Sequence, residues 1–198
     1  MHFYEPRAGH RLPHDPFNAL VAPRPIGWVS TRSADGVLNL APYSFFNAFN
    51  YTPPIIGFSS NGWKDSVANV EATGEFVWQL VSRSLLEPMN QTATTRKVDE
   101  FAAAGLTPAA SRVVTVPRVA EARVAMECRL SQLVRLTGAD GSPTVSTVVF
   151  GEVVGVHIDE ELLVDGVVDT AAADPVMRGG GPTTYFTLGE RLDLRRPD

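Results

Sequence analysis

The sequence predicts a mainly β protein whose consecutive strands pair antiparallel, with three short helices inserted between them. Two observations carry this prediction. Short apolar runs recur along the chain with turn residues between them, and two long strand-like segments, 124–136 and 144–158, flank a turn at 138–141. Short turns favour antiparallel neighbours, because parallel strands need a crossover of about a dozen residues or more. We therefore expect an antiparallel sheet or barrel that forms a single domain over residues 1–198.

The first half of the chain is expected to contribute three strands, over residues 26–31, 38–46 and 55–59. The first two are joined by Asp35-Gly36, a pair that is typical of a hairpin turn. Pro42 lies inside the second segment, and a proline cannot donate a hydrogen bond to a neighbouring strand. We therefore place this segment at the edge of a sheet or at a bulge.

Three helical segments are expected between the strands. In residues 65–73 the apolar positions change to a helical period, and Gly74 is expected to end the helix. Ser84-Leu85-Leu86-Glu87 has the pattern of a capping box, which indicates the start of a second helix. Residues 98–104 predict one or two further helical turns, and a buried strand over residues 75–81 lies between the first two helices.

The long segment 124–136 is expected to be a half-buried strand. Apolar residues occupy most even positions, and polar residues such as Glu127 occupy the odd ones. Cys128, the single cysteine, is therefore interpreted as a buried strand residue with no partner for a disulfide. Gly151 and Gly155 in the returning strand indicate bulges or close packing.

Composition excludes several classes of protein. Hydrophobic residues make up 44% and charged residues 20% of the chain, which is close to the average of globular proteins. The net charge of −5 removes the basic surface on which nucleic-acid binding usually depends. No apolar run approaches the roughly 18 residues that a membrane-spanning helix needs. The polar N-terminal arm, residues 1–16, lacks the apolar region of a secretory signal, so we expect a cytoplasmic protein.

Motifs for acid–base, nucleophilic or metal catalysis are not found. His10 and His14 have the spacing of two helical metal ligands, but Pro13 lies between them and no further ligand completes a set. His157 is alone on a strand and is interpreted as structural. The glycine-rich segment 178–182 lacks the Lys-Ser/Thr ending of a P-loop and is interpreted as a flexible loop. We expect no metal site and assign no catalytic side chain.

Residues 24–66 combine hydroxyl, cationic and apolar side chains in a way that suits flavin mononucleotide (FMN). Lys64-Asp65-Ser66 begins a predicted helix, where a cation, a hydroxyl and free N–H groups suit a phosphate. We interpret Asp65 as the N-cap of that helix. Ala41 through Asn47 offers an apolar wall for a ring, and small hydroxyl residues suit the ribityl chain: Ser30, Thr31, Ser59 and Ser60. From composition and spacing alone the alternative is open that these serines belong to strand edges and turns, with Lys64 in solvent.

Several motifs in the same order resemble those of the flavin reductase-like, FMN-binding split-barrel family. The resemblance covers about residues 10–190. It rests on the segments that match the family's motifs, namely 21–31 (VAPRPIGWVST), 39–47 (NLAPYSFFN), 64–66 (KDS) with 69–77, 88–90, 98–108 and 150–158.

This resemblance implies a six-stranded antiparallel split barrel that forms a homodimer, with FMN near the dimer interface. The family's flavin-binding positions fall on these residues: Ser30, Thr31, Ala41, Pro42, Tyr43, Ser44, Phe45, Phe46, Asn47, Ser59, Ser60, Lys64, Asp65 and Ser66. Trp63 stands where many relatives carry a basic residue, which indicates either weaker phosphate binding or an aromatic side chain at the flavin or pocket mouth. Arg178 is expected to be a neighbour of the site.

The resemblance leaves three functions open. Some members are flavin reductases that use NADH or NADPH and supply reduced flavin to a partner monooxygenase; these favour an oxidoreductase that passes hydride to the flavin. Others resemble flavoredoxin, an electron carrier that docks with a redox protein. A third possibility is a split barrel that binds another planar ligand without redox chemistry.

Overall fold

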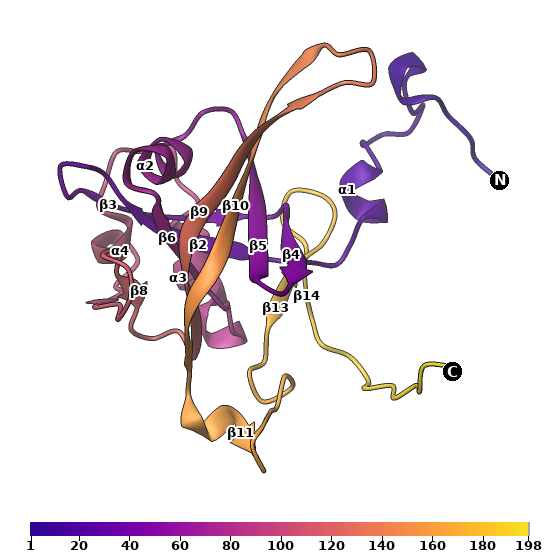
Figure 1. Ribbon diagram of the computed structural model, residues 1–198. Helices are drawn as coiled ribbons and strands as arrows, with labels where there is room; N and C mark the ends of the chain where they lie inside the picture. The colour runs from indigo at the N-terminus through magenta and orange to yellow at the C-terminus, as the bar shows by residue number, and fades with distance from the viewer. Residues whose placement is uncertain (198) are drawn as a thin grey trace.

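The computed structural model, which describes residues 1–197, has a mainly β architecture built around one antiparallel sheet of seven strands (Figure 1). The strand order is β3-β2-β6-β9-β10-β5-β4. The bounds are β2 (Gly27–Arg32), β3 (Leu38–Tyr43), β4 (Phe46–Tyr51), β5 (Pro54–Asn61), β6 (Glu75–Gln79), β9 (Val124–Thr137) and β10 (Pro143–Ile158). The antiparallel split-barrel class predicted from the sequence is confirmed.

The sheet curls so that its first strand, β3, returns to β5. Tyr43 at the end of β3 contacts Phe58 of β5, with ring centroids 4.5 Å apart. Six strands, from β3 to β5, thus enclose the barrel interior. The seventh, β4, is a difference from the predicted six: it forms a hairpin with β5 and, within residues 1–197, pairs with that strand alone. Pro42 lies in β3 at the edge of the sheet, as predicted.

Short elements complete the chain. The helices are η1 (Pro6–Ala8), α1 (Phe17–Leu20), α2 (Asp65–Thr73), η2 (Arg83–Leu85), α3 (Leu86–Gln91), α4 (Glu100–Ala103) and η3 (Glu160–Leu162), where η denotes a 3-10 helix. The short strands are β1 (Arg24–Pro25), β7 (Pro108–Ala109), β8 (Arg118–Val119), β11 (Leu163–Val164), β12 (Val167–Val168), β13 (Val176–Arg178) and β14 (Tyr185–Thr187). None of the helices in residues 1–197 has the length and apolar character needed to cross a membrane.

The core has two main parts, one on each face of the curled sheet. Inside the barrel, aromatic and branched side chains pack under α2, which contributes the fully buried Val67 and Val70. On the outer face, Trp28 and Leu40 pack against α3 and α4 through Met89 and other apolar residues. Helix α2 therefore covers the barrel interior, and its N-terminus lies beside the free edge of β3.

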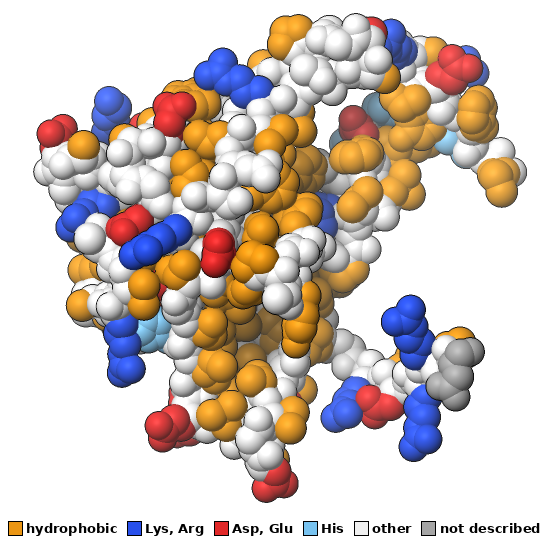
Figure 2. Space-filling view, in the orientation of Figure 1, with side chains coloured by type: hydrophobic (Ala, Val, Ile, Leu, Met, Phe, Trp, Pro, Cys, Tyr) orange, Lys and Arg blue, Asp and Glu red, His pale blue; other side chains and the backbone are white. Residues whose placement is uncertain are grey.

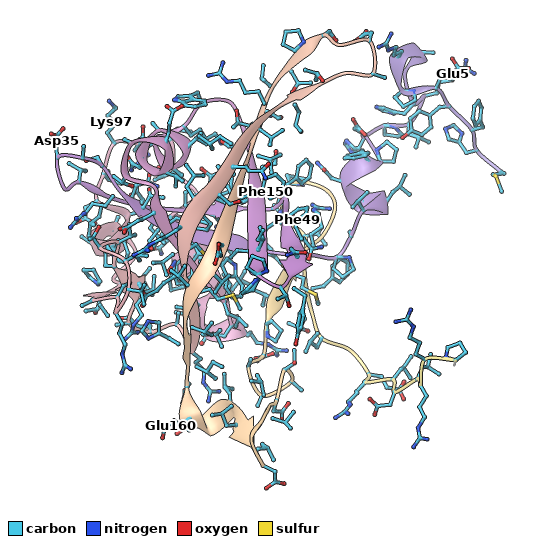
Figure 3. The ribbon with its side chains drawn as sticks, viewed as in Figure 1. Glu5, Asp35, Phe49, Lys97, Phe150 and Glu160 are labelled. Carbon is cyan, nitrogen blue, oxygen red and sulfur yellow. The ribbon has the colours of Figure 1, made fainter. Side chains whose placement is uncertain are left out.

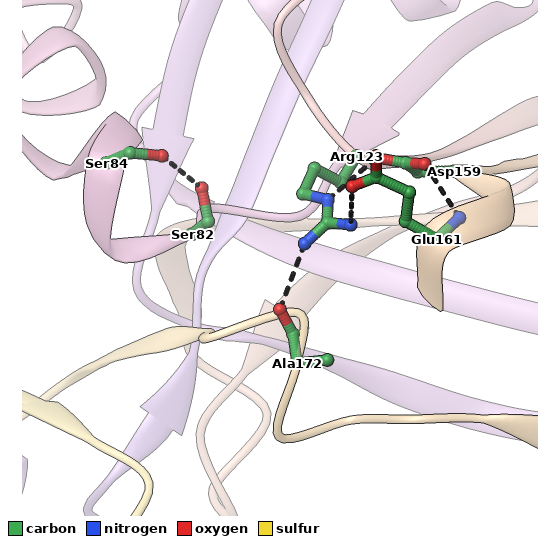
Figure 4. Close-up of polar contacts among 6 residues, drawn as sticks. All are labelled: Ser82, Ser84, Arg123, Asp159, Glu161 and Ala172. Carbon is green, nitrogen blue, oxygen red and sulfur yellow. Dashed lines mark hydrogen bonds and ion pairs between the residues drawn. The ribbon is translucent and has the colours of Figure 1, made fainter. Parts of the chain in front are cut away.

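Helix α2 has the predicted bounds, and Gly74 ends it with a left-handed φ of +73°. The predicted capping box at Ser84 is wrong. The helix α3 begins after Leu85, and the Ser84 hydroxyl contacts the Ser82 hydroxyl at 2.9 Å instead (Figure 4). The third predicted helix is shorter than expected, because Asp99 accepts a hydrogen bond from the Ala102 N–H and so caps α4 one residue before Glu100.

The β9–β10 hairpin extends well beyond the barrel, and the N-terminal arm lies beside its tip (Figure 1). Arg7 of the arm and Asp140 of the turn form an ion pair at 2.8 Å. At the base of the hairpin, Arg123 holds Asp159 at 2.8 Å, Glu161 at 3.2 Å and the Ala172 carbonyl at 3.1 Å (Figure 4).

The simple alternation predicted for segment 124–136 is wrong in two places. Glu127 is fully buried although it occupies an odd position, while Val134 and Leu136 are exposed in the projecting part of the hairpin. The prediction that Cys128 is a buried strand residue is confirmed. Gly151 and Gly155 both lie at register shifts between β9 and β10, as predicted.

Arg24 of β1 joins three separate segments through one guanidinium group. It donates hydrogen bonds to four backbone carbonyls, those of Asn18, Val21, Ser44 and Gly179. Arg178 holds the glycine-rich segment in the same way, through the carbonyls of Gly181, Pro182 and Thr184. These bonds fix the start of the chain and the segment after β13 against the loop between β3 and β4.

Candidate functional site

A polar groove lies between the free edge of β3, the N-terminus of α2 and the loop that precedes α4. Its cavity volume is about 250 Å³. Its lining residues are mostly charged or hydroxyl-bearing, and we call this set the polar groove: Asn39, Ala41, Tyr43, Lys64, Asp65, Ser66, Thr94, Thr95, Arg96, Lys97 and Glu100. The volume is below the roughly 300 Å³ of typical small-molecule pockets, so the groove can hold only part of a larger ligand.

The N-terminus of α2 presents unpaired donors to the polar groove. The first N–H groups of any helix have no acceptor within the helix, and at α2 these belong to Asp65 and Ser66. The predicted N-cap role of Asp65 is wrong, because the N-cap is Lys64 and no side chain accepts a capping hydrogen bond. Asp65 is instead the first helical residue, where a carboxylate interacts favourably with the helix dipole.

The Tyr43 hydroxyl is the clearest unsatisfied group in the polar groove. Tyr43 is only 6% exposed, and its hydroxyl has no hydrogen-bond partner among the described residues. The hydroxyls of Ser66 and Ser60 flank it. Burial raises the pKa of the Tyr43 hydroxyl, the two serine hydroxyls act against this, and the nearby Asp65 carboxylate raises it further. The group is therefore protonated at neutral pH and can donate a hydrogen bond to a ligand.

The floor of the polar groove is a network of amides and hydroxyls. The Asn39 amide donates to Ser66 Oγ at 2.9 Å and to Thr31 Oγ1 at 3.3 Å. The Asn69 amide also donates to Thr31 Oγ1, at 3.1 Å. Because Ser66 accepts from Asn39, its own O–H stays free to donate toward the groove.

Two anchors place the loop 93–98 over the groove. At its start, the Trp28 indole donates to Thr92 Oγ1 at 3.0 Å, and Thr92 Oγ1 donates to the Met89 carbonyl. At its end, Asp99 caps α4. Between them the Thr94 hydroxyl accepts from the Arg96 N–H at 3.1 Å. The loop thereby carries two hydroxyls and two cations to a site whose other residues are far away in the sequence.

The free edge of β3 is covered by a single carboxylate. The Leu40 N–H donates to Glu100 Oε2 at 3.3 Å, away from β2. Two residues on, the N–H that would point to the same side is missing, because that residue is Pro42. Burial raises the pKa of the Glu100 carboxyl, although the Leu40 N–H opposes this.

The charges of the polar groove favour an anion. Lys64, Arg96 and Lys97 are exposed, and within the described part of the chain none of them forms an ion pair. Two carboxylates, Asp65 and Glu100, stand against these three cations. Cations and free helical N–H groups together suit a phosphate.

A second cavity, of about 400 Å³, lies on the outer face of β10, β5 and β4 and is largely aromatic. We call it the aromatic pocket; its lining residues are Phe17, Val21, Arg24, Phe45, Phe46, Asn47, Phe49, Gly57, Phe58, Ser59, Val148 and Phe150. Phe49 and Phe150 meet edge to face with ring centroids 5.0 Å apart. Figure 3 labels the two residues, which lie near each other beside β5 and β4. The missing side chain of Gly57 leaves room for both rings, since a Cβ there would lie 2.8 Å from Phe150.

The predicted flavin-binding residues are divided between these two cavities. Ala41, Tyr43, Lys64, Asp65 and Ser66 line the polar groove, while Phe45, Phe46, Asn47 and Ser59 line the aromatic pocket. Tyr43 and Phe58, whose rings are in contact, form a shared wall.

Five predicted residues line neither cavity. Ser30 is fully buried and donates to the Pro117 carbonyl at 2.6 Å, and Ser60 is buried and donates to the Gly62 carbonyl at 2.8 Å. Thr31 supports the groove through Asn39. Pro42 lies in the edge strand, and the Ser44 carbonyl accepts from Arg24. Alternation along a strand does not tell which face a serine occupies when both faces are buried.

Trp63 and Arg178, both expected near the site, have other contacts. Trp63 is about half exposed and lies under the Arg135 guanidinium, 5.0 Å from the ring centroid, outside both cavities. Arg178 organises the glycine-rich segment and contacts the Tyr185 ring. Residues 1–197 contain no group of three or more His, Cys, Asp or Glu side chains that could hold a metal ion.

Sequence reasoning missed the loop residues of the polar groove. The run Thr94-Thr95-Arg96-Lys97 combines two hydroxyls with two cations between two predicted helices, and this composition was the available signal. Glu100 and Asn39 carried no such signal, because each acts through one long-range hydrogen bond.

Comparisons with known proteins show one matching family and several similar proteins. The family model described as "Flavin reductase like domain" matches residues 20–172. An uncharacterised protein of Aquifex aeolicus is 40% identical over 179 residues, covering 86% of this chain and 88% of that one. Nitrilotriacetate monooxygenase component B from Bacillus cereus is 33% identical with a TM-score of 0.88, covering 98% of each chain. A 2-nitrobenzoate 2-nitroreductase of Pseudomonas fluorescens is 30% identical with a TM-score of 0.80, covering 91% of this chain and 88% of that one.

Proposed function

Because the chain belongs to the flavin reductase-like domain family, we propose that it is an FMN-binding oxidoreductase that passes hydride from NADH or NADPH to the flavin. The observation that supports the flavin site is the polar groove. There, among residues 1–197, a buried donor without a partner and three cations outside any ion pair surround a helix N-terminus. Each of these features has a counterpart in the ribityl phosphate of FMN.

The residues of the polar groove fit the phosphate end of this cofactor. Lys64 and the N–H groups of Asp65 and Ser66 would hold the phosphate, with Arg96 and Lys97 supplying further charge. The Tyr43 and Ser66 hydroxyls would donate to the phosphate or to the ribityl chain. A buried hydroxyl without a partner costs about 1–3 kcal/mol, so a ligand oxygen that accepts from Tyr43 would offset this cost.

The ring end of the cofactor needs an apolar wall and access for a second molecule. Residues 41–47 run from the polar groove to the aromatic pocket, and the open aromatic pocket offers flat side chains for a ring to stack on. FMN bound here would supply the redox chemistry, which is hydride transfer from a nicotinamide. The residues of the two cavities would position the two rings, and no side chain would need to act as acid, base or nucleophile.

We propose that the electrons go to a partner monooxygenase or another redox protein. This is supported by the similarity to nitrilotriacetate monooxygenase component B, which is named as one part of a monooxygenase. The relative that is 30% identical is named a 2-nitrobenzoate 2-nitroreductase, and this name implies the reduction of a small aromatic compound. A direct small-molecule acceptor is thus the second candidate, favoured by the aromatic pocket.

We also propose that the chain forms a homodimer. Apolar side chains gather in a hollow over β10, β5 and β4, bordered by the N-terminal arm (Figure 2). The exposed members include Phe45, Phe49 and Tyr51. Apolar patches of this kind typically mark an interface or a ligand site.

Titration of the purified protein with FMN, followed by flavin fluorescence, tests the flavin site. We expect tight quenching by the wild type. The double variant Lys64→Ala, Ser66→Ala should bind at least about tenfold more weakly, the equivalent of roughly 1.4 kcal/mol for lost phosphate contacts. Tyr43→Phe should also weaken binding, yet leave the protein without FMN at least as stable, because it removes an unpaired hydroxyl.

The matched control is Arg83→Ala, Ser84→Ala, which removes a cation and a hydroxyl from η2, outside both cavities. Absence of FMN binding by the wild type, or equal binding by all variants, would refute the flavin site. Given binding, steady consumption of NADH or NADPH in the presence of FMN supports the reductase. Binding without any nicotinamide turnover would refute it and leave an electron carrier.

A further inference from the structure

A further cavity, of about 470 Å³, lies at the base of the β9–β10 hairpin. Three arginines line it, Arg112, Arg118 and Arg123, and we call it the arginine cavity. It shares no lining residue with the polar groove or the aromatic pocket. Its volume lies within the roughly 300–1,000 Å³ of small-molecule pockets.

Arg118 is the unsatisfied group of the arginine cavity. It belongs to β8, and the adjacent Val119 is fully buried in the core, which fixes the backbone at this point. Arg118 is partly buried, and its Nε atom is buried without a hydrogen-bond partner among residues 1–197. A buried donor of a charged group that lacks an acceptor costs free energy, so an anion that accepts from this guanidinium would offset a cost.

Arg112 and Arg118 are the two arginines of the cavity that remain available to a ligand. Neither forms an ion pair within the described part of the chain. Arg123 differs, because it contacts Asp159, Glu161 and a backbone carbonyl (Figure 4). Two guanidinium groups thus face the cavity without a protein carboxylate.

The carboxylates near the cavity are engaged elsewhere or lie in solvent. Asp159 is paired with Arg123, and Glu121 accepts the Thr107 N–H. Glu160, at the lower end of the molecule in Figure 3, is exposed. The buried Glu127 accepts three backbone N–H groups and contacts His157, which also lines the cavity.

These charges favour a ligand with a single negative charge. Three carboxylates and three arginines line the cavity, so its formal charges balance. A phosphate, with nearly two charges, would meet repulsion that the arginines do not outweigh. A carboxylate carries one charge and matches the planar fork of a guanidinium with two oxygens.

An apolar wall stands beside the arginines. Val156 and Ile158 of β10 line the cavity and are 53% and 37% exposed. They lie two positions apart on a strand and therefore share one face. A guanidinium can also stack on a flat ring. The wall and the arginines together suit a ligand that has a flat apolar body and one carboxylate.

We propose that the arginine cavity binds a small aromatic monocarboxylate. The carboxylate accepts hydrogen bonds from Arg118 and Arg112, and the ring lies against Val156 and Ile158. Because the cavity shares no residue with the polar groove or the aromatic pocket, this site is independent of the proposed flavin site.

Calorimetric titration with benzoate tests the proposal, because benzoate has the ring and the carboxylate and nothing else. Benzamide has the same shape without the charge, acetate lacks the ring, and inorganic phosphate has the larger charge. We expect saturable binding of benzoate by the wild type. The other three compounds should bind at least about tenfold more weakly, since each lacks one feature that the cavity recognises.

Two variants and a control locate the site. Arg118→Gln should weaken benzoate binding about tenfold or more. Val156→Glu places a like charge at an exposed position, and should do the same even if Arg118→Gln folds poorly. Arg129→Gln changes an exposed arginine of β9 that lines none of the three cavities, and should match the wild type. Thermal unfolding shows that each variant is folded.

Several outcomes would overturn the proposal. Absence of saturable benzoate binding by the wild type shows that the cavity is no carboxylate site, and equal binding of benzamide shows that the arginines do not recognise the charge. Benzoate binding that persists in both Arg118→Gln and Val156→Glu places the ligand elsewhere. If that binding is lost in Phe49→Asp, the ligand occupies the aromatic pocket. An equal loss in Arg129→Gln means that general charge, and not this cavity, attracts benzoate.

Discussion

At the scale of single residues, the Glu127 carboxylate supplies the hydrogen-bond acceptors that a neighbouring strand would otherwise provide to three consecutive backbone N–H groups. Its side chain is 0% exposed, yet it accepts the N–H groups of Arg112, Val113 and Val114 at 2.6–2.8 Å and contacts His157 Nε2 at 2.5 Å. Burial alone would raise the pKa of this carboxyl. The hydrogen bonds from the three backbone N–H groups and from His157 outweigh burial and lower it to about 2.

This pairing predicts acid sensitivity. A carboxyl whose pKa falls from its ordinary value near 4.5 to about 2 on folding stabilises the fold above pH 4.5, by about 3 kcal/mol in order of magnitude. That stability is lost as the pH falls from about 4.5 toward 2. Urea unfolding at pH 7 and at pH 3 should show the loss in the wild type, and Glu127→Gln should be less stable at pH 7 with a smaller loss at pH 3.

Glu121→Gln is the control for Glu127, because its carboxylate also accepts a backbone N–H, that of Thr107, but lies at the surface. Against the effect of burial, the hydrogen bonds with Thr107 lower the pKa of the Glu121 carboxyl as well. Because solvent screens this surface group, Glu121→Gln should remove a smaller part of the pH dependence than Glu127→Gln does. An unchanged pH dependence in Glu127→Gln would contradict the assignment of acid sensitivity to this group.

At this scale the sequence predicted which residues lie at the N-terminus of α2, but not which face of a strand each polar side chain occupies. Lys64 and Ser66 were placed correctly because the change to a helical period at residue 65 predicted where α2 begins. Ser30 and Glu127 point into buried surroundings instead, since both faces of their strands are covered. The hydrogen bonds that make these polar positions tolerable come from segments 87 and 13–15 residues away, which no local pattern records.

At the scale of elements, the two glycines of β10 were informative because each corresponds to a register shift. Gly151 also accommodates a neighbour. A Cβ at this position would lie 2.3 Å from the nearest ring carbon of Phe76, which is completely buried in the barrel. The capping box predicted at Ser84 does not form, because the Ser84 hydroxyl contacts the Ser82 hydroxyl instead of the backbone of the helix.

We expect Gly151→Ala to destabilise the protein, because the barrel interior has no room for the added methyl group. Overpacking of this kind typically costs about 1–3 kcal/mol. Thermal unfolding should show a lowered midpoint, with Gly189→Ala as control, since position 189 has no atom within 4 Å of an added Cβ. A midpoint equal to that of the control would mean that Phe76 moves aside freely.

At the scale of the whole molecule, the proposed homodimer predicts that the hollow in Figure 2 is covered in solution. Phe49 lines the aromatic pocket and is 56% exposed. Light scattering after size exclusion should give twice the 21.4 kDa of one chain for the wild type. Phe49→Asp should shift the protein toward the single chain, because a charge in an apolar interface must lose its hydration.

Val164→Asp changes an apolar residue of the same exposure, 56%, in the β11–β12 hairpin, and should leave the mass unchanged. A wild-type mass of one chain would reject the homodimer. Persistence of the dimer in Phe49→Asp would place the interface on another face.

The strands and α2 could be predicted because each depends on neighbouring residues, whereas the polar groove could not be predicted as a whole. Its loop, residues 93–98, has no period of its own, and its place is fixed where the Trp28 indole meets Thr92, 64 residues away. The barrel closure depends likewise on Tyr43 meeting Phe58. Local sequence predicts what each segment is, and these distant contacts decide which segments share a site.

The hydrogen bonds that Arg24 donates to three separate segments have a consequence for how this chain tolerates mutation. All four of its acceptors are backbone carbonyls, which every amino acid provides. Asn18, Val21 and Ser44 can therefore be replaced by other residues without loss of the hydrogen bonds from Arg24. Position 24 has no such freedom, because a lysine ammonium is a point charge and cannot fan its donors in a plane toward three segments. In a library of single substitutions, position 24 should therefore tolerate few replacements, while Asn18, Val21 and Ser44 tolerate many. Gly179 is the exception among the acceptors, because a Cβ there would lie 2.6 Å from Phe186.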